Sequence, residues 1–391
     1  KNEIIRFTQT SPDNIVVIDG NPKKRADQYE AAKSAQWLVV HYNAIILKDA
    51  KKVLPELCLG AFLVADEVHR IKDHTTATAK QIKKIASRAS CRLGLSGTPV
   101  ENKPGEWYNV FSGFVYPGIF GSVFNFLETY SYPGEFGGYT GARNLPQLAK
   151  RSRFLYVRHR LEEVAEHLPP MRVETMVLDP TPTYKAALDG LHASAKEEIA
   201  AGRISKAEER FGELDAEQTE EAKAGSELTA TSMLKMACCS PLLIHQSDSE
   251  SAKALVEAGV VPDEDGPKIE KLREIAKVAA LNNDRIVVFC FSKKMVNVIA
   301  DRLTTDGVRY VTYTGDTNRA QRDEAVEAFT SPSTQTDPGP TIFLATDAAA
   351  EGLNLGACCS TLVNLDIPWT PGRLGQRNGR IRRLDSKVTG F

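Results

Sequence analysis

The residues best suited to catalysis begin with an acidic pair, Asp66 and Glu67, which His69 follows closely. The pair comes directly after the apolar run 59–65, which predicts a buried strand. Ligands bind at the carboxyl ends of parallel strands, so these side chains should face a ligand. Both carboxylates suit Mg²⁺: Asp66 is placed to hold the ion, and Glu67 to orient or deprotonate an attacking water. The plainer alternative is that Asp66 caps a helix.

A small loop with hydroxyl side chains follows the next apolar segment, and it comprises Ser96, Gly97 and Thr98. At this spacing after the acidic pair, its hydroxyls can move between the carboxylates and a ligand cleft. The loop would then couple two sites, and His69 is placed to relay between a bound ligand and Ser96. The alternative is a strand-exit turn whose hydroxyls cap the following helix.

Near the end of the chain, polar and basic side chains could neutralise negative charge on a ligand. They are Gln376, Arg380 and Arg383. Arg380 and Arg383 lie three positions apart, so on a helix they share a face. A planar guanidinium brought to a phosphoryl group in transfer neutralises the developing charge and contributes roughly 10³–10⁵ in rate. We interpret Arg377 and Arg382 as the solvated side of the same basic helix end.

A third polar loop follows the predicted strand 341–345 and is rich in small residues, which let the backbone approach a ligand closely. Thr346 could reach a phosphate of a nucleic-acid strand. Gly352 and Asn354 could close over a nucleotide. The alternative is an ordinary turn between a strand and a helix.

The sequence identifies contacts to nucleic acid less clearly. Phosphate contacts from hydroxyls and backbone amides give a grip that does not depend on base sequence. The formal net charge is -1, so any basic surface must be local. Each candidate also has a structural alternative, such as core packing for the tryptophan. The candidates are Tyr42, Ser292, Thr346, Trp369 and Arg158.

The elements that must position these groups form two α/β lobes. In residues 1–110, and again from residue 268 onward, short apolar strands alternate with helices, which predicts parallel sheets covered on both faces. Ala, Glu and Lys dominate from 184 to 230, which predicts helix. We therefore predict a first lobe with an aromatic-rich extension over 1–175, a helical insertion and linker over 176–267, and a second lobe over 268–391.

The composition of the 391 residues predicts two or three domains. No apolar run approaches the roughly 20 residues that a membrane helix needs. The seven cysteines form no C-x-x-C pattern, and an odd number argues against a disulfide scaffold. We expect an intracellular, reduced protein without a structural metal.

In this order the motifs resemble those of the Swi/Snf-type ATPases, a branch of the superfamily-two helicases, over nearly the whole chain. The segments 366–371 and 379–381 look more like bacterial and phage members than eukaryotic ones. The segments that resemble motifs Ib to VI are Trp37–Tyr42, Asp66–His69, Leu95–Pro99, Phe289–Ser292, Thr346–Leu355 and Gln376–Arg383. The segments that resemble features of the branch itself are 118–122, 154–159 with 168–170, and 236–241.

The resemblance implies two RecA-like, doubly wound parallel-sheet lobes around a cleft for ATP and Mg²⁺. His69, Gly352 and Asn354 would contact the nucleotide. It implies double-stranded DNA as the partner, with a DNA-bound protein complex as a further one, no membrane association, and a monomer. We expect this protein in the cytoplasm of a bacterial or phage-infected cell, associated with the nucleoid. Its activity would be translocation along the duplex, remodelling DNA or DNA–protein complexes.

Two departures from the family pattern qualify this expectation. Motif II carries Val68 where Ala is usual, and we expect it to pack without touching the chemistry. No G-x-x-x-x-G-K-[ST] segment occurs, so we expect the P-loop upstream of Lys1 and little activity from these residues alone.

Two alternatives stay open at this point. One is a strand-separating helicase or an RNA polymerase-recycling ATPase. The other is a module that binds DNA or a partner without hydrolysis, which the missing P-loop lysine favours for these residues. Glu67, Arg380 and Arg383 together favour the enzyme, because a scaffold has no need of them.

Overall fold

The computed structural model describes residues 1–97, 100, 103–134, 138–164, 168, 171–200, 231–248, 250–332, 339–350 and 353–382. The chain divides into two compact units, Lys1–Arg158 and His159–Phe391. The predicted helical insertion belongs to the second unit, and its residues 201–230 lie outside the described ranges. The strands outside the 132–140 hairpin are short, pair in parallel and alternate with helices, so the predicted α/β class is confirmed.

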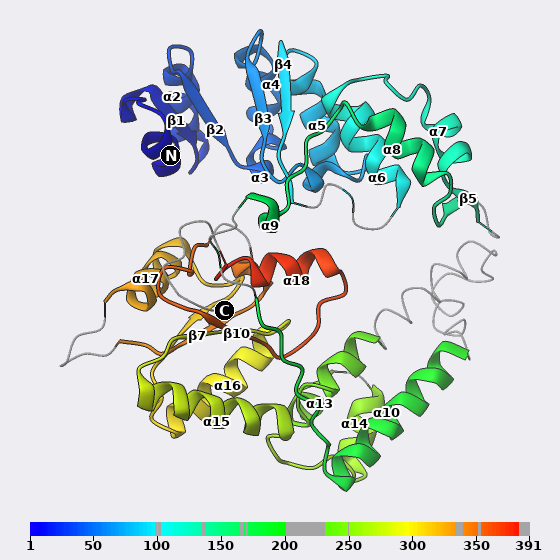
Figure 1. The fold of residues 1–391 in the computed structure, drawn as a ribbon, viewed down its shortest axis with the longest axis vertical. Helices are drawn as coiled ribbons and strands as arrows, with labels where there is room; N and C mark the ends of the chain where they lie inside the picture. Colours follow the sequence, from blue (N-terminus) through cyan, green and yellow to red (C-terminus); the bar gives the residue numbers. More distant parts are fainter. Residues whose placement is uncertain are drawn as a thin grey trace. The chain divides into compact units, whose positions relative to one another are not determined.

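The first unit holds its parallel strands as two separate pairs, β1–β2 and β3–β4 (Figure 1). Its strands are β1 (Ile15–Ile18), β2 (Trp37–Val40), β3 (Phe62–Ala65), β4 (Cys91–Gly94), β5 (Tyr132–Pro133) and β6 (Tyr139–Thr140). Its α-helices are α1 (Asn2–Phe7), α2 (Pro22–Ala32), α3 (Tyr42–Ile45), α4 (Ala50–Leu57), α5 (Ala77–Ala86), α6 (Pro104–Val110), α7 (Val123–Tyr130) and α8 (Leu145–Ser152). Short turns η1 (Pro12–Asn14) and η2 (Val68–Ile71) are 3₁₀-helical, and η3 (Phe111–Val115) is a π-helix.

The register of β3 and β4 decides where the acidic pair and the hydroxyl loop emerge. Ala65 pairs with Gly94, so both strands end at the same edge. Beyond them Leu95 N donates to Ala65 O at 2.9 Å, and Val68 N donates to Leu95 O at 2.8 Å. The two loops are therefore held together by backbone hydrogen bonds, independently of their side chains.

The two faces of the β3–β4 pair differ in burial. Ala65 belongs to the core of the unit, together with Ile82 and Ile85 of α5. On the other face Phe62 is 62% exposed and Leu93 is 42% exposed. Parallel strands are generally covered on both faces. This face is therefore an apolar surface in the described part of the unit.

Aromatic side chains pack the region after β4, as the sequence predicted. The α6 helix runs into the π-helix η3, and the rings of Trp107 and Phe111 stack with centroids 4.5 Å apart. Phe126 of α7 lies 5.2 Å from Tyr108 and 5.1 Å from Phe120, measured between ring centroids. The region after β4 thus consists of short helices joined by aromatic packing.

The second unit contains a four-stranded parallel sheet in the order β10-β7-β9-β8. Its strands are β7 (Ile286–Phe289), β8 (Tyr310–Tyr313), β9 (Ile342–Ala345) and β10 (Thr361–Asn364). Its helices are α9 (Leu161–Val164), α10 (Pro182–Ala200), α13 (Leu242–His245), α14 (Glu250–Glu257), α15 (Pro267–Asn282), α16 (Lys293–Thr305), α17 (Arg319–Thr330) and α18 (Pro371–Asn378), with the 3₁₀ turn η4 (Asp347–Ala349).

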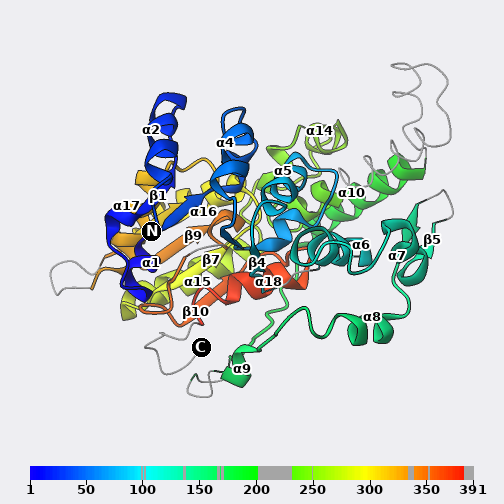
Figure 2. The same cartoon turned by 90° about the horizontal axis from the view of Figure 1, so that it is seen from above.

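Both faces of this sheet are covered (Figures 1 and 2). Alternate residues of the central strand β7 point to opposite sides: Val288 packs with α15 and α16, whereas Phe289 packs with Phe329 of α17. Phe289 pairs with Asn364 of β10 and with Ala345 of β9. The loops after β7, β9 and β10 therefore emerge at one edge, which is where the predicted contacts Ser292, Thr346 and Trp369 lie.

The described part of the helical insertion has its own small core. Tyr184 and Leu191 of α10 pack with Met233 and Ala237 of the helical residues 231–237, and with Ile244 of α13. The Tyr184 hydroxyl donates to the carbonyl of Ala237. These contacts join segments on either side of residues 201–230.

Candidate active site and nucleic-acid interface

Glu67 has an unusual backbone conformation for a residue with a side chain. Its φ and ψ are 49° and 54°, in the left-handed region. Such strain costs about 1–3 kcal/mol and persists where the surroundings enforce it, often at functional sites. Here the enforcing contacts are the bonds from Leu95 N to Ala65 O and from Val68 N to Leu95 O. Glu67 N also donates to Asp66 Oδ1 at 3.0 Å, which orients the neighbouring carboxylate.

His69 connects the acidic pair to the hydroxyl loop. Its Nδ1 lies 3.2 Å from Glu67 Oε2 and 3.1 Å from Ser96 Oγ. Nδ1 is therefore within hydrogen-bonding reach of both oxygens, and whether it donates or accepts depends on the tautomer of the ring. The imidazole is buried, with 9% of the residue exposed, so few other orientations are open to it. The predicted proximity of His69 and Ser96 is present in the structure.

Val68 packs away from the carboxylates, as expected from the sequence. It is 2% exposed and belongs to the core of the first unit. A Cβ built on Gly94 would lie 3.1 Å from both methyl carbons of Val68, which is tighter than ordinary contact. Gly94 on the neighbouring strand therefore makes the room that the larger side chain at this position needs.

Tyr42 lies against motif II. Its hydroxyl donates to the backbone carbonyl of Asp66 at 2.8 Å. Burial, and then the negative charge of Asp66, raise the pKa of Tyr42 to about 12. The side chain supports the acidic pair in this structure, and its contact with nucleic acid remains a prediction.

The remaining residues of the hydroxyl loop are only partly described. A Cβ built on Gly97 would meet no atom within 4 Å, so the loop is open at that point. Thr98 lies outside the described residues. The coupling role of Ser96, Gly97 and Thr98 therefore remains a prediction, supported at Ser96 by its contact with His69.

The acidic pair fits the chemistry of Mg²⁺. Asp66 is exposed at the carboxyl end of β3, and the side chain of Glu67 is 33% exposed. Mg²⁺ prefers oxygen ligands and keeps several of its waters, with one or two carboxylates and substrate phosphates completing the shell. Asp66 would hold the ion, and Glu67 is near enough in sequence to ligate it or a water bound to it. No cluster of three or more ligating side chains occurs in the described ranges.

Arg380 is buried in the second unit, with 9% of the residue exposed. Its Nε donates to the carbonyl of Gln376 at 3.0 Å, and its Nη1 donates to the carbonyl of Leu353 at 3.0 Å. Leu355 N in turn donates to the carbonyl of Arg380 at 2.9 Å. This arginine thus joins the end of α18 to the loop that contains Asn354. Its catalytic role, like that of Gln376, remains a prediction.

The interpretation of Arg377 as a solvated residue was wrong. Arg377 is 0% exposed, and its Nε donates to Asp347 Oδ1 at 2.6 Å. Its Nη1 donates to the carbonyl of Asp366 at 3.0 Å, and its Nη2 lies 3.5 Å from Asp366 Oδ2. A buried guanidinium is tolerated here because two carboxylates, from the loops after β9 and β10, neutralise it. Arg382 is likewise half-buried rather than solvated.

The loop after β9 begins with Thr346, which is 9% exposed. The exposed Asn354 lies further along this loop, where its Oδ1 accepts from Gly356 N at 3.3 Å. Gly352 and Arg383 lie outside the described residues, so their predicted roles are not addressed by the geometry.

The predicted nucleic-acid contacts of the second unit differ in exposure. Trp369 is 64% exposed on the loop between β10 and α18. Ser292 has a structural role, because it caps α16 by accepting a hydrogen bond from Met295 N at 3.2 Å. Its hydroxyl hydrogen can still be donated to another group. Arg158 is exposed at the end of the first unit.

Sequence reasoning missed Lys235, Asp347 and Asp366. Lys235 lies on the helical residues 231–237, with its Nζ 2.9 Å from Asp366 Oδ2. Asp347 lies two residues beyond the end of β9 and Asp366 two residues beyond the end of β10, and this position after a strand was the available signal. Their partners could not be read from the sequence, because the contacts join distant segments.

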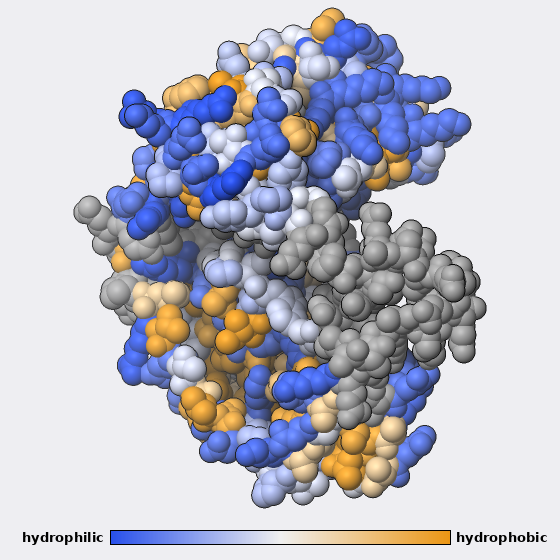
Figure 3. Space-filling view, turned by 90° about the vertical axis from the view of Figure 1, so that its right-hand side faces the viewer, coloured by the Kyte–Doolittle hydropathy of each residue, from blue (hydrophilic) through white to orange (hydrophobic). Residues whose placement is uncertain are grey.

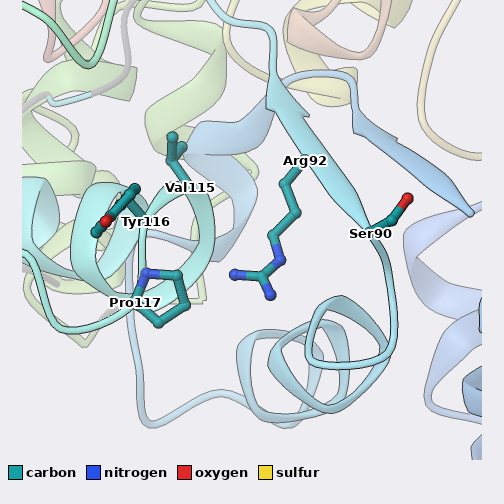
Figure 4. Close-up of a pocket in the computed structure, with 5 residues that line it drawn as sticks. All are labelled: Ser90, Arg92, Val115, Tyr116 and Pro117. Carbon is teal, nitrogen blue, oxygen red and sulfur yellow. The ribbon is translucent and has the colours of Figure 1, made fainter. Parts of the chain in front are cut away.

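A hollow of about 350 Å³ beside β4 does not have the features of a binding site (Figure 4). Two of the donors of Arg92 are used within the fold: Nε donates to Ala86 O at 2.8 Å and Nη1 to Phe114 O at 3.4 Å. Arg92 therefore ties the end of α5 to the π-helix. The lining residues are Ser90, Arg92, Val115, Tyr116 and Pro117.

Among the described residues, no helix is both long and apolar enough to cross a membrane. On the face seen in Figure 3, hydrophilic side chains predominate and hydrophobic ones gather in separate patches.

The fold and site define a class: paired α/β units with an acidic pair on one and an arginine-bearing helix on the other. Comparison with known proteins agrees with this class. The family model of the SNF2-related domain matches residues 1–243, and that of the helicase conserved C-terminal domain matches residues 267–385. The chain therefore belongs to the SNF2-related family of the helicase superfamily.

Individual relatives are distant. The chain is 26% identical over 358 residues to the probable ATP-dependent DNA helicase CHR12 of Arabidopsis thaliana, covering 90% of this chain and 29% of that protein. It is 23% identical over 322 residues to the uncharacterized ATP-dependent helicase YqhH of Bacillus subtilis, covering 83% of this chain and 53% of that protein. The helicase domain of Hef from Pyrococcus furiosus shares the fold, with a TM-score of 0.50 at 16% identity over 97% of this chain and 80% of that one.

Proposed function

We propose that the full-length protein is an ATP-dependent translocase on double-stranded DNA, which remodels DNA or DNA–protein complexes. The observation that carries the proposal is the position of His69 Nδ1, within 3.2 Å of Glu67 and 3.1 Å of Ser96. A carboxylate that activates water is thereby linked to a loop that can respond to a second ligand. A module that only binds has no use for such a link.

In this proposal Glu67 orients and deprotonates the attacking water, and His69 holds the Glu67 carboxylate in place. Asp66 holds Mg²⁺, which supplies positive charge beside the phosphates when it is bound. Arg380 neutralises the charge that develops on the transferred phosphoryl group, with Arg383 and Gln376 assisting. Hydrolysis then depends on residues of both units, and His69, Gly352 and Asn354 contact the nucleotide.

Duplex DNA is the proposed partner because the predicted contacts favour phosphates over bases. Ser292, Thr346 and Trp369 follow strands whose ends lie at one edge of the second unit's sheet. Tyr42 and Arg158 would add contacts from the first unit. We further propose that the protein acts as a monomer in the cytoplasm, associated with the nucleoid.

The test measures steady-state ATP hydrolysis by the full-length protein with and without duplex DNA. A translocase should hydrolyse faster with duplex, and should displace a third strand from a triplex without separating a forked duplex. Separation of the fork would favour the strand-separating helicase. Equal rates with and without DNA, or no hydrolysis at all, would contradict the proposal.

A further inference from the structure

Lys235 occupies an unusual place between two rings and a carboxylate. Its Nζ lies 5.0 Å from the ring centroid of Phe291 and 5.1 Å from that of Trp369. The same nitrogen lies 2.9 Å from Asp366 Oδ2, and only 14% of the Lys235 side chain is exposed. A buried ammonium that contacts two ring faces and an anion at once is held in one orientation.

The two rings belong to neighbouring strand ends. Phe291 directly precedes Ser292 after β7, and Trp369 lies on the loop after β10, which pairs with β7. Lys235 itself comes from the helical insertion, far from both in sequence. One side chain therefore joins the insertion to the two loops that carry predicted contacts to DNA.

The contact also reaches the arginine helix. Asp366 receives Lys235 on Oδ2, and the same oxygen lies 3.5 Å from Nη2 of the buried Arg377. Arg377 in turn donates from Nε to Asp347 Oδ1, in the loop after β9. Lys235 and Arg377 are the two cations beside the buried Asp366, and Arg377 and the more exposed Arg373 lie beside Asp347. Loss of Lys235 would therefore leave the Asp366 carboxylate with Arg377 alone.

Trp369 needs such support. The side chain is large and 64% exposed, and an exposed side chain samples several rotamers unless a contact selects one. A cation over the face of a tryptophan contributes about 0.5–2 kcal/mol, which is enough to select a rotamer.

We propose that Lys235 is a positioning residue, which fixes the ring of Trp369 in the orientation that contacts duplex DNA. The claim that the ring contacts DNA rests on the proposed function, whereas the claim that Lys235 fixes the orientation of the ring does not. Lys235 itself need not touch a phosphate, because its charge is already taken up by Asp366.

The first test uses tryptophan fluorescence of the full-length protein. The signal of Trp369 is the difference between each protein and its Trp369→Phe counterpart. Lys235→Met keeps the apolar stem and removes the charge, so acrylamide should quench Trp369 more strongly and its anisotropy should fall. Lys235→Arg should restore both values. The control is Lys253→Met, an exposed lysine on α14 of the same insertion, which should change neither. Unchanged quenching in Lys235→Met would overturn the proposal.

The second test measures binding of a fluorescein-labelled duplex. The expected loss for Lys235→Met is about twofold to thirtyfold, from the strength of one such contact. The double variant Lys235→Met/Trp369→Phe should bind no more weakly than Trp369→Phe alone. A further additive loss, with a reduced salt dependence, would mean that Lys235 contacts phosphate directly and would contradict the positioning role. If the unaltered protein fails to bind duplex, the proposed function fails, while the fluorescence result still decides the role of Lys235.

Discussion

The Nδ1 of His69 lies 3.1 Å from the Oγ of Ser96, although the two residues follow different strands. The parallel register of β3 and β4, with Ala65 opposite Gly94, brings the two loops to the same edge. The contact is therefore a consequence of strand pairing. The side chain of His69 alone bridges the hydroxyl loop and Glu67.

Replacing Glu67 with Gln should abolish ATP turnover in the full-length protein while leaving nucleotide binding nearly intact. The amide keeps the shape but cannot take a proton, and a general base typically contributes about 10²–10⁴ in rate. Steady-state hydrolysis with duplex DNA and calorimetric binding of ATP measure the two effects. Glu30→Gln, at an exposed residue that pairs with Lys33, is the control. Normal turnover in Glu67→Gln would exclude the assigned role.

Ser96→Ala should weaken the stimulation of ATP hydrolysis by DNA more than it weakens the rate without DNA. The substitution removes the hydroxyl that His69 contacts, and one hydrogen bond corresponds to about 0.5–1.5 kcal/mol, or roughly threefold to tenfold. The ratio of the two rates is the measurement, with the exposed Ser34→Ala as control. An equal fall in both rates would argue against coupling.

Arg380→Ala should lower kcat by about 10³ or more, and Arg380→Lys should recover little of it. Lysine keeps the charge but lacks the planar fork that donates to several oxygens at once. Because Arg380 also donates to the carbonyls of Gln376 and Leu353, thermal unfolding of each variant must be compared with the unaltered protein. Wild-type turnover by a folded Arg380→Ala variant would remove the assignment.

Arg377→Met should destabilise the second unit by about 3–5 kcal/mol, because breaking a buried ion pair leaves carboxylates unpaired. Asp366, 4% exposed, loses one of its two cations. Arg373→Met is a matched control: it lies 3.7 Å from the same Asp347 but its side chain is 53% exposed, so the expected cost is below about 1 kcal/mol. Urea unfolding measures both, and equal costs would show that burial is not the cause.

Tyr42 should give the protein a loss of stability at alkaline pH that Tyr42→Phe lacks. Its pKa is raised from the ordinary 10.0 to about 12, so the folded state holds the proton more tightly than the unfolded state. The stabilisation is fully present below the unfolded pKa and is lost as the pH rises through the folded one. Urea unfolding at about pH 8 and about pH 11 should show a steeper fall for the unaltered protein. Parallel curves would contradict a raised pKa of Tyr42.

Much of the site could be predicted from local sequence. The apolar run before Asp66 marked a strand, and the strand does end there. The chain position of Ser96 after the next strand was enough to expect it near His69, because parallel strands end together. The π-helix at Phe111–Val115 and the left-handed backbone of Glu67 carried no signal in the sequence, since neither has a glycine or proline pattern that requires it.

The failure at Arg377 has a physical reason. Beside Arg380 and Arg382, it reads as part of a basic, solvated helix end. Its burial depends on Asp347 and Asp366, which come from loops after two other strands. The sequence of α18 itself does not reveal that these two carboxylates lie beside Arg377.

The types of chemical group and the ends of the strands on which they lie follow from local sequence, because strand and helix formation depend on the spacing of apolar residues over short stretches. The tertiary structure alone decided which charges are buried together, as in the contacts of Lys235, Asp366 and Arg377. The contact of Lys235 with Asp366 joins residues far apart in the chain, and that of Arg377 with Asp366 joins a helix to the loop before it. The strength of both depends on the exclusion of water, which only the packed fold provides.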